Sequence, residues 1–497
     1  MKFATDHHKP EAILRTSDLK GSKSCHIGNT SVTERSSNSF RCFTKRRDLS
    51  PSRKASLAPP DIIIYNMVEE KFKVLTFNCW AVFFPSPTVR KEDRVNAIAA
   101  KLSVGDFDVI LLQEIWLESD YRKLRNILDE KYPYSNYFYC NLIGTGMCIF
   151  SKWTIECVFT HPFTANGYPH LIHQADYYCG KGIGLARITS KEGFRINFYV
   201  THLIARYELD RMLDKYNGHR ISQLVEIMEF VRMTSTGSDA IIITGDFNLE
   251  SNTSAIELFS TSLKLSDAWL NNTVALKNTN ITELESEGCT CDRADNPYRN
   301  QLWTNTYGNG ERLDYIFYRS GPSIIDSFHI PSYAKLVCDS CWLDMRKVPD
   351  DPYGLHYSDH EGVAASFTIT RLRNPVKPEG ETMSANELNR LRDLLLDIDQ
   401  QLTRGLNQCI HGRLLHLIWA IFITIILIIL ILIYPTDRLT SIIKCLFEIL
   451  LGIILFTLIW GSLIGRTIEK SGLKNAKHSI STLSSRLDSS NDFTLIK

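Results

Sequence analysis

Two polar side chains follow an apolar run near the middle of the chain. Residues 240–243 are apolar and lead through Thr244 and Gly245 into Asp246 and Asn248. A short β-branched run that stops at glycine is typical of a buried strand ending at a sheet edge. Because side chains alternate along an extended segment, Asp246 and Asn248 point to the same side. A carboxylate and an amide so placed can hold a metal ion, a water molecule or a phosphoryl oxygen, although the same residues are also common in turns.

Other apolar or alternating runs also carry residues at one end that can bind a metal or move a proton. These residues are Asn78 after 73–77, Glu114 after 108–113, His202 at the end of 195–202, Asp314 near the start of 312–318, and Asp359 and His360 before 362–367. One or two such ends arise by chance. A whole set indicates that the strands bring carboxylate, amide and imidazole groups to one shared site.

The spacing of these runs predicts the elements that position them. Strand patterns alternate with helical patterns at 92–102, 121–128 and 209–233. Such alternation is typical of an α/β domain in which helices cover a sheet. We therefore predict one compact catalytic domain at residues 67–372.

Composition argues against some classes of function. The 497 residues include 56 Lys and Arg against 55 Asp and Glu, so the charge gives no reason to expect nucleic acid as a partner. The 13 cysteines lack the spacing of a disulfide framework, and we expect reduced thiols facing the cytosol. The close pairs Cys289/Cys291 and Cys338/Cys341 could hold zinc, but a single residue separates the first pair, which is unusual for zinc ligands. The oligomeric state has no signal in the sequence.

The regions flanking the domain differ from it in composition. Residues 1–66 are polar and rich in Ser, Lys and Arg, a composition that predicts a disordered tail. Either Met1 or Met67 could be the translation start. Residues 373–413 predict a linker and then an amphipathic juxtamembrane helix that begins with a capping box at Ser384. Its apolar stripe comprises Leu388, Leu391, Leu395, Ile398 and Leu402. We expect this stripe to pack on the domain or on a second copy, with a position on the lipid surface as the alternative.

Two apolar segments near the C-terminus predict a transmembrane hairpin. Residues 414–434 carry no formal charge, and 442–464 carry charge only near their start. Each is long enough to cross about 30 Å of hydrocarbon at about 1.5 Å per residue. Basic residues are more frequent outside the hairpin than at its tip, which favours a position of both chain ends in the cytosol. We expect residues 465–497 to form a polar tail there. The organelle stays open among the endoplasmic reticulum, the Golgi and the inner face of the plasma membrane.

The order of the motifs resembles the DNase I-like phosphodiesterase superfamily. The matching motifs are Thr76-Phe-Asn-Cys-Trp80, Leu112-Gln-Glu-Ile-Trp116, Thr201-His-Leu203, Gly245-Asp-Phe-Asn248, Arg312-Leu-Asp-Tyr-Ile316 and Ser358-Asp-His360. Within it, residues 144–152 and 166–173 and the paired C-terminal spans resemble the magnesium-dependent neutral sphingomyelinases. The resemblance covers roughly residues 71–470. It implies an α/β fold of the four-layer αββα sandwich type, followed by the juxtamembrane helix and the hairpin.

The resemblance also implies a function. It implies a membrane-anchored phosphodiesterase that hydrolyses sphingomyelin to ceramide and phosphocholine, with lyso-phosphocholine lipids as further candidate substrates. The implied cofactor is Mg²⁺, with Mn²⁺ as an alternative ion, and the implied partner is the lipid bilayer.

Phosphodiester hydrolysis requires an activated water and neutralisation of charge on the phosphoryl oxygens. We expect His360 to be the general base, because imidazole titrates near neutral pH, and Asp314 to hold its tautomer. Glu114 and Asn78 offer an anionic and a neutral oxygen to Mg²⁺. The remaining expectations are that Asp246 positions water or metal, that Asn248 and His202 donate to the phosphate, and that Asp359 contacts the metal or the residues around it.

Two further pairs have two interpretations each. Asp176 and Lys181 flank a loop that in similar proteins governs access of the substrate, with a surface ion pair as the alternative. Phe83 and Phe84 follow Asn78 and could contact lipid at the mouth of the site or be buried in the core.

The sequence is less consistent with three other functions. A nuclease of the same superfamily would share the motifs, but the balanced charge and the hairpin oppose it. An inositol-polyphosphate 5-phosphatase would carry a different segment at residues 311–316. A catalytically silent membrane scaffold would not need a complete set of ligand-type residues.

Overall fold

The computed structural model describes residues 68–489 except 84–87, 272–284, 309, 322–323, 326–330 and 374–383. All described residues belong to one compact unit, residues 64–497. The predicted tail at 1–66, both candidate start residues and Phe84 therefore lie outside the described residues.

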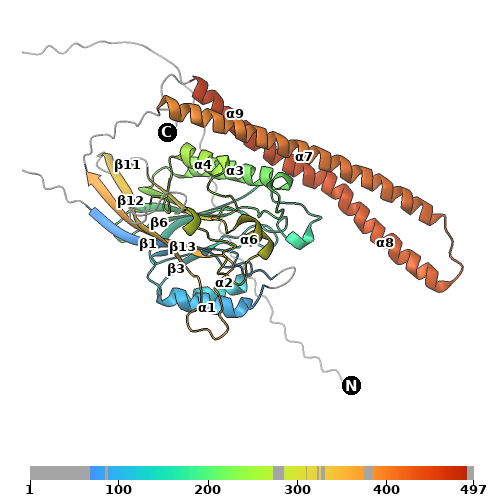
Figure 1. Cartoon of the computed structure of the whole chain (residues 1–497), viewed down its shortest axis with the longest axis horizontal. Coiled ribbons are helices and arrows are strands. Elements are labelled where there is room, and N and C mark those ends of the chain that lie inside the picture. The colour runs from blue at the N-terminus through green and yellow to red at the C-terminus, as the bar shows by residue number, and fades with distance from the viewer. Residues whose placement is uncertain are drawn as a thin grey trace, which may run out of the picture. The chain divides into compact units, whose positions relative to one another are not determined.

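Two mixed β-sheets form the centre of the domain (Figure 1). The first sheet has the order β11-β12-β13-β1-β2-β4-β3, with bounds β11 Ile324–Ile325, β12 Pro331–Asp344, β13 Gly362–Arg373, β1 Val68–Asn78, β2 Val109–Gln113, β4 Cys148–Ser151 and β3 Tyr134–Tyr137. The second has the order β5-β6-β7-β8-β10-β9, with bounds β5 Thr154–Pro162, β6 Gly182–Thr189, β7 Arg195–His202, β8 Ala240–Asp246, β10 Asp314–Ser320 and β9 Ser266–Asp267.

Helices cover the outer faces of both sheets (Figure 1). The helices of the catalytic domain are α1 Lys91–Val104, α2 Glu118–Leu128, α3 Asn217–Thr234, α4 Ser254–Leu263 and α6 Gln301–Tyr307, with short 3-10 turns η1 Ile172–Gln174 and η2 Arg211–Leu213. Helices α1 and α2 pack on the first sheet, while α3 and α4 pack on the second. The predicted αββα sandwich is therefore confirmed.

Alternating side chains on the strands build the separate cores. On β1, Phe72 and Val74 point into the core between the two sheets, whereas Leu75 and Phe77 point towards α1 and α2. This is the period of two expected for a strand that is covered on both faces. The sandwich therefore holds the ends of β1 and β8, which carry candidate site residues, at fixed positions.

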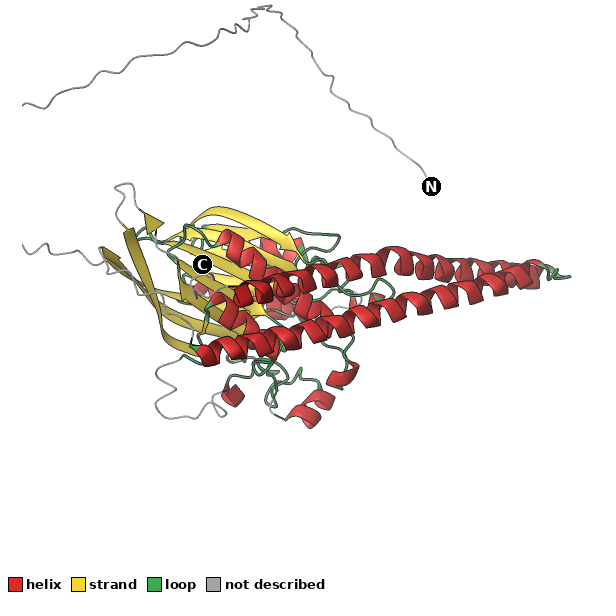
Figure 2. Cartoon of the chain, turned by 90° about the horizontal axis from the view of Figure 1, so that it is seen from above, coloured by secondary structure: helices red, strands yellow, loops and turns green. Residues whose placement is uncertain are grey.

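The C-terminal region forms a long helical hairpin. It consists of α7 Ala385–Ile431, α8 Arg438–Trp460, the π-helix η4 Gly461–Gly465 and α9 Arg466–Ser489. The capping box at Ser384 is confirmed. The predicted juxtamembrane helix and first span are one continuous helix, α7, whose stripe packs on the catalytic domain together with α9. Figure 2 shows α7 and α8 side by side, extending beyond the sheets.

The last helix differs from the predicted polar tail at 465–497. Its apolar side chains recur every three or four residues and lie on one face. They are Leu473, Ala476, Ile480, Leu483 and Leu487, and all are buried in the core formed with α3, α4 and α7. The described part of the predicted tail is therefore a structural helix of the domain.

Two helical stretches are long and apolar enough to cross a membrane. Only 6% of the most apolar window of each is buried within the protein. A core helix of a soluble domain would be mostly buried. The exposure of these apolar surfaces therefore indicates anchoring in a membrane.

Candidate active site

Strand register aligns three candidate residues in the second sheet. His202 pairs with Asp246 across the parallel strands β7 and β8, and Asp314 pairs with Asp246 across the antiparallel strands β10 and β8. Directly paired residues on neighbouring strands lie on the same face of a sheet. Gly245 has a φ of 137°, and a Cβ there would lie 1.9 Å from the backbone oxygen of Thr201. Glycine is therefore required for the backbone to reach Asp246.

The first sheet contributes Asn78 and Glu114. Asn78 ends β1 and pairs with Gln113, the last residue of β2, so Glu114 follows at the same sheet edge. Nδ2 of Asn78 donates to Oε1 of Glu114 at 3.3 Å and to Oδ2 of Asp246 at 3.0 Å. This amide joins the catalytic ends of the two sheets.

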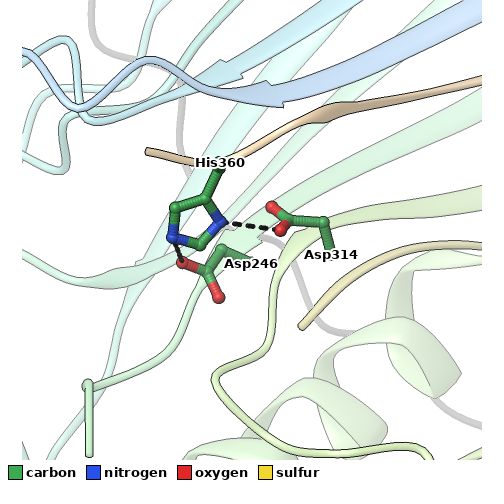
Figure 3. Close-up of side chains that lie close together, drawn as sticks. All are labelled: Asp246, Asp314 and His360. Atoms are coloured by element: carbon green, nitrogen blue, oxygen red, sulfur yellow. Dashed lines mark hydrogen bonds and ion pairs between the residues drawn. The ribbon is translucent and has the colours of Figure 1, made fainter. Parts of the chain in front are cut away.

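His360 lies between two aspartates (Figure 3). Its Nδ1 is 2.8 Å from Oδ2 of Asp314, and its Nε2 is 3.9 Å from Oδ2 of Asp246. Burial alone lowers the pKa of His360, but Cys291 and Asp314 outweigh it and raise the pKa well above its usual value. Burial and the charge of Asp314 raise the pKa of Asp246 to about 6.

The site contains groups suited to a cation. One ligand atom from each of Asp246, Asp314 and His360 lies within 4.8 Å of the others, so this cluster could hold a metal ion. Oε2 of Glu114 is buried and has no hydrogen-bond partner among the residues that the structure describes. Burial raises the pKa of Glu114, because a desolvated carboxylate is costly to charge. Glu114 also has a φ of 59°, a conformation that is uncommon outside glycine and concentrated at functional sites.

Asn78 is oriented as a donor. Its Oδ1 accepts from the backbone N–H of Trp80 at 3.0 Å, while its amide nitrogen faces the carboxylates. To offer its oxygen to a cation, the amide would have to turn over and lose the bond from Trp80. In this geometry Asn78 orients Glu114 and Asp246.

Asp176 and Lys181 form a buried ion pair at 3.0 Å, with side chains 5% and 4% exposed. The alternative of a surface ion pair therefore does not hold. Nζ of Lys181 also donates to the backbone oxygen of Leu203 at 3.0 Å and lies 3.2 Å from Nε2 of His202. Burial lowers the pKa of Lys181, but Asp176 and Glu114 outweigh it, so the ammonium stays charged beside the site.

His202 is neutral in this setting. Burial and the neighbouring Lys181 lower the pKa of its imidazole well below the usual value. Nε2 lies 3.6 Å from Oδ2 of Asp246 and 3.8 Å from Oε1 of Glu114. The structure thus brings His202 into contact range of both carboxylates.

Asn248 and Asp359 lie at the edge of the site. The backbone N–H of Asn248 donates to Oδ1 of Asp246 at 2.9 Å, and its side chain donates to the backbone oxygen of Leu203 at 3.0 Å. Oδ1 of Asp359 accepts from Oγ of Ser358 at 3.1 Å. Burial raises the pKa of Asp359 to about 6.

Two neighbours of these residues were not predicted from sequence. Cys291 pairs in an isolated bridge with His360, and the two side chains interact. Arg94, buried on α1, donates to the backbone oxygens of Cys79, Trp80 and Tyr357 at 2.9, 2.7 and 3.1 Å. Arg94 therefore fastens the chain after Asn78 to the chain before His360. A lone arginine on a helix carries no sequence signal for such a role.

These side chains open into a cavity of about 630 Å³. Glu114, His202, Asp246, Asp359 and His360 are among the residues that line it. Gln401 and Arg404 of α7 also line it. The helix that continues into the apolar hairpin is thus part of the catalytic cavity.

Comparisons with known proteins identify one matching family and several proteins that are similar to this chain. Residues 75–360 match the Endonuclease/Exonuclease/phosphatase family. A presumed neutral sphingomyelinase of Caenorhabditis elegans is 31% identical over 430 residues, which cover 84% of this chain and 91% of that protein. Sphingomyelin phosphodiesterase 2 of Homo sapiens is 30% identical over 339 residues, covering 68% and 74% respectively. The chain in the crystal structure of SmcL is 23% identical in sequence to this chain. The structural match covers 60% of this chain and 99% of the SmcL chain, with a TM-score of 0.42.

Proposed function

Since the chain belongs to the endonuclease/exonuclease/phosphatase family and, within it, to the neutral sphingomyelinases, we propose that it hydrolyses sphingomyelin to ceramide and phosphocholine. The single observation that carries the proposal is the contact between His360 and Asp314 beside Glu114 and Asp246. This contact supports a base that is oriented by Asp314 and faces a cavity shared with the carboxylates of Glu114 and Asp246.

Glu114 is the residue that we assign to Mg²⁺. Its buried Oε2 lacks a partner, and hard cations of this kind prefer carboxylate oxygens. Asp246 and Asp359 supply further carboxylates, and Asn78 holds Glu114 and Asp246 in place. When bound, the ion supplies positive charge that neutralises phosphoryl oxygens. Mn²⁺ suits the same oxygen ligands.

His360 is the base in this mechanism. A water molecule attacks phosphorus while its proton passes to Nε2, and the bond from phosphorus to the ceramide oxygen breaks. The ceramide oxygen takes a proton from solvent and leaves as the hydroxyl of ceramide, and His360 then returns its proton to solvent. Asp314 accepts from Nδ1 and so keeps Nε2 directed at the water. The pKa of His360 would be lowered by a cation held by Glu114 and Asp246, because a nearby positive charge disfavours the imidazolium and leaves Nε2 free to accept a proton.

The phosphate needs donors around it. Lys181 keeps a charged ammonium beside His202 and the carboxylates, so it offsets negative charge that develops during attack. Asn248 lines the cavity next to Asp246 and places its amide near the same centre. Asp176 holds Lys181 in position through their buried ion pair.

The hairpin holds this chemistry at a bilayer. Both ends of a hairpin lie on the same side of the membrane, and the excess of basic residues beyond the hairpin supports a catalytic domain that faces the cytosol. Substrate lipids stay in the membrane, so anchoring raises their local concentration at the cavity.

Purified protein tests the proposal directly. Hydrolysis is measured with sphingomyelin, lyso-phosphocholine lipids, inositol phosphates and abasic DNA, each with Mg²⁺, with Mn²⁺ and with a chelator. We expect phosphocholine release from sphingomyelin that the chelator abolishes. Cleavage of abasic DNA or inositol phosphates without release of phosphocholine would overturn the proposal.

A further inference from the structure

A second cavity of about 150 Å³ adjoins the catalytic cavity. Four residues line both cavities: Val82, Glu114, Ala205 and Tyr207. The two spaces therefore meet at Glu114, the carboxylate that we assign to the metal ion.

The wall of this second cavity is apolar on one side. Its apolar residues include Val82, Phe83, Trp116, Ile143, Ala175 and Cys179. The same six side chains form a small hydrophobic cluster separate from the three large cores. Attack on a phosphodiester uses polar groups and a cation, so this apolar lining has no part in the chemistry itself. It suits an apolar group attached to the reacting phosphate.

A loop that contacts both α7 and α8 forms part of the remaining wall. His173, Gln174, Ala175 and Asp176 line the cavity from this loop, and Lys181, the buried ion-pair partner of Asp176, also lines it. The rings of His170 and His416 lie 5.0 Å apart. The rings of Tyr177 and Trp460 lie 5.6 Å apart.

His416 and Trp460 belong to the predicted spans 414–434 and 442–464, at the ends nearest the domain. The loop with η1 therefore lies at the level where both spans leave the bilayer. Ile172, within η1, is 54% exposed at this level. An apolar cavity beside the metal-binding residue is thus walled by a loop at the membrane boundary.

We propose that this second cavity binds the ceramide portion of the substrate next to the scissile bond. Its volume suits the first few carbons of the lipid backbone, while the two hydrocarbon chains stay in the bilayer. The larger cavity then holds the phosphocholine headgroup, and the scissile bond lies at Glu114 between them. In this placement the amide and hydroxyl of the lipid backbone would lie beside the polar residues of the smaller cavity, which include Gln174 and Tyr207. This inference rests on the proposed function.

Filling the cavity tests the assignment. Ile143 lines only the smaller cavity, and Ile143→Trp reduces its space. Leu142→Trp is the matched control, because Leu142 is the adjacent residue, is 83% exposed and lines neither of the two cavities. Each variant is assayed on sphingomyelin in detergent micelles and on p-nitrophenyl phosphocholine, which has the same headgroup and no lipid chain.

For Ile143→Trp we expect kcat/KM for sphingomyelin, divided by kcat/KM for the chromogenic ester, to fall about tenfold. The ratio should not change in Leu142→Trp. Should Ile143→Trp fail to fold by circular dichroism, Ile143→Asn places a polar group in the same lining and should lower the same ratio. An unchanged ratio in the folded variant overturns the cavity assignment. A wild-type protein that does not cleave sphingomyelin overturns the proposed function instead.

The position of the loop has its own test. Ile172→Glu places a charge where the loop meets the membrane, whereas Tyr353→Glu changes a side chain that is 82% exposed on a loop outside both cavities. We expect Ile172→Glu to lose at least fivefold on vesicles of phosphatidylcholine and sphingomyelin relative to micelles, and Tyr353→Glu to keep the wild-type ratio. Equal vesicle-to-micelle ratios in the two variants would place the loop away from the bilayer and overturn access from the membrane.

Discussion

Nδ1 of His360 lies 2.8 Å from Oδ2 of Asp314, and this contact crosses from one sheet to the other. His360 precedes β13 of the first sheet, whereas Asp314 begins β10 of the second. The base and its orienting carboxylate therefore meet only when both sheets are packed together. Catalysis depends on the inter-sheet core as directly as on the two side chains.

Removing the base should abolish most activity without unfolding the protein. His360→Ala is expected to lower kcat by at least the roughly 10²–10⁴-fold that general-base catalysis supplies. Asp314→Asn keeps the shape of the orienting residue, and the double variant should lose little more than His360→Ala, because the two residues act as a unit. Steady-state kinetics on micellar sphingomyelin measure these losses, with thermal unfolding as the control. Multiplicative losses in the double variant would show that the pair acts independently.

Weakening the cation site should make activity depend on the ion concentration. Glu114→Gln keeps the size of the side chain and removes its negative charge. We expect activity at low Mg²⁺ to fall and to recover in part at high Mg²⁺. Calorimetric titration of Mg²⁺ should show a correspondingly weaker dissociation constant. Glu118→Gln, on the exposed start of α2, is the matched control and should leave both measurements unchanged. An unaltered ion requirement in Glu114→Gln would rule out Glu114 as a ligand.

The hairpin can be removed without removing the helices at its base. Oγ of Ser462 donates to the backbone oxygen of Arg413 at 3.4 Å, so a loop of about four residues can replace 414–461 and join the two helices directly. The resulting protein should stay folded and soluble and cleave sphingomyelin in micelles. Its activity on vesicles should fall most of the way to zero, because the local substrate concentration is lost. Equal rates on both substrates would show that anchoring serves only to locate the enzyme.

Unlike that replacement, truncation after residue 410 should destabilise the catalytic domain, because it also removes α9. Leu473 of α9 is 1% exposed and packs where Gly218 of α3 meets Gly405 of α7. Leu473→Ala should lower the free energy of unfolding by about 2–5 kcal/mol. Lys474→Ala, at the next and exposed position, should change it by less than about 0.5 kcal/mol. Chemical denaturation in detergent measures both, and a stable Leu473→Ala protein would show that α9 is dispensable.

Much of the site follows from strand ends alone. His202, Asp246 and Asp314 each lie at the end of an apolar strand, and neighbouring strands must bring such ends together. Local sequence does not encode the contacts made across the fold. The burial of Lys181 and the position of Cys291 beside His360 depend on pairings between distant segments. These features could not be predicted from spacing.

Two predictions about helices were wrong, one about where a helix begins and one about whether the C-terminal segment is helical. The helix predicted at 209–233 begins only at Asn217, because Met212 and Leu213 are exposed on η2 instead of forming part of a core face. The spacing of apolar residues in α9 was visible in the sequence, but it lies among many polar residues. Its burial depends on contact with α3 and α7, which α9 reaches only after the chain has folded back from the hairpin.

The packing of α9 sets an order on the synthesis of this protein. The last strand of the catalytic domain ends at Arg373, but α3 on its second sheet is fully covered only when α9 packs against it with side chains between residues 473 and 487. The ribosome must therefore release both apolar helices of the hairpin before the domain can complete its own core. A nascent chain can therefore complete its phosphodiesterase fold only after the segments that anchor it have been synthesised. The order of residues along the chain thus delays the complete lipid hydrolase until its own membrane anchor has been made.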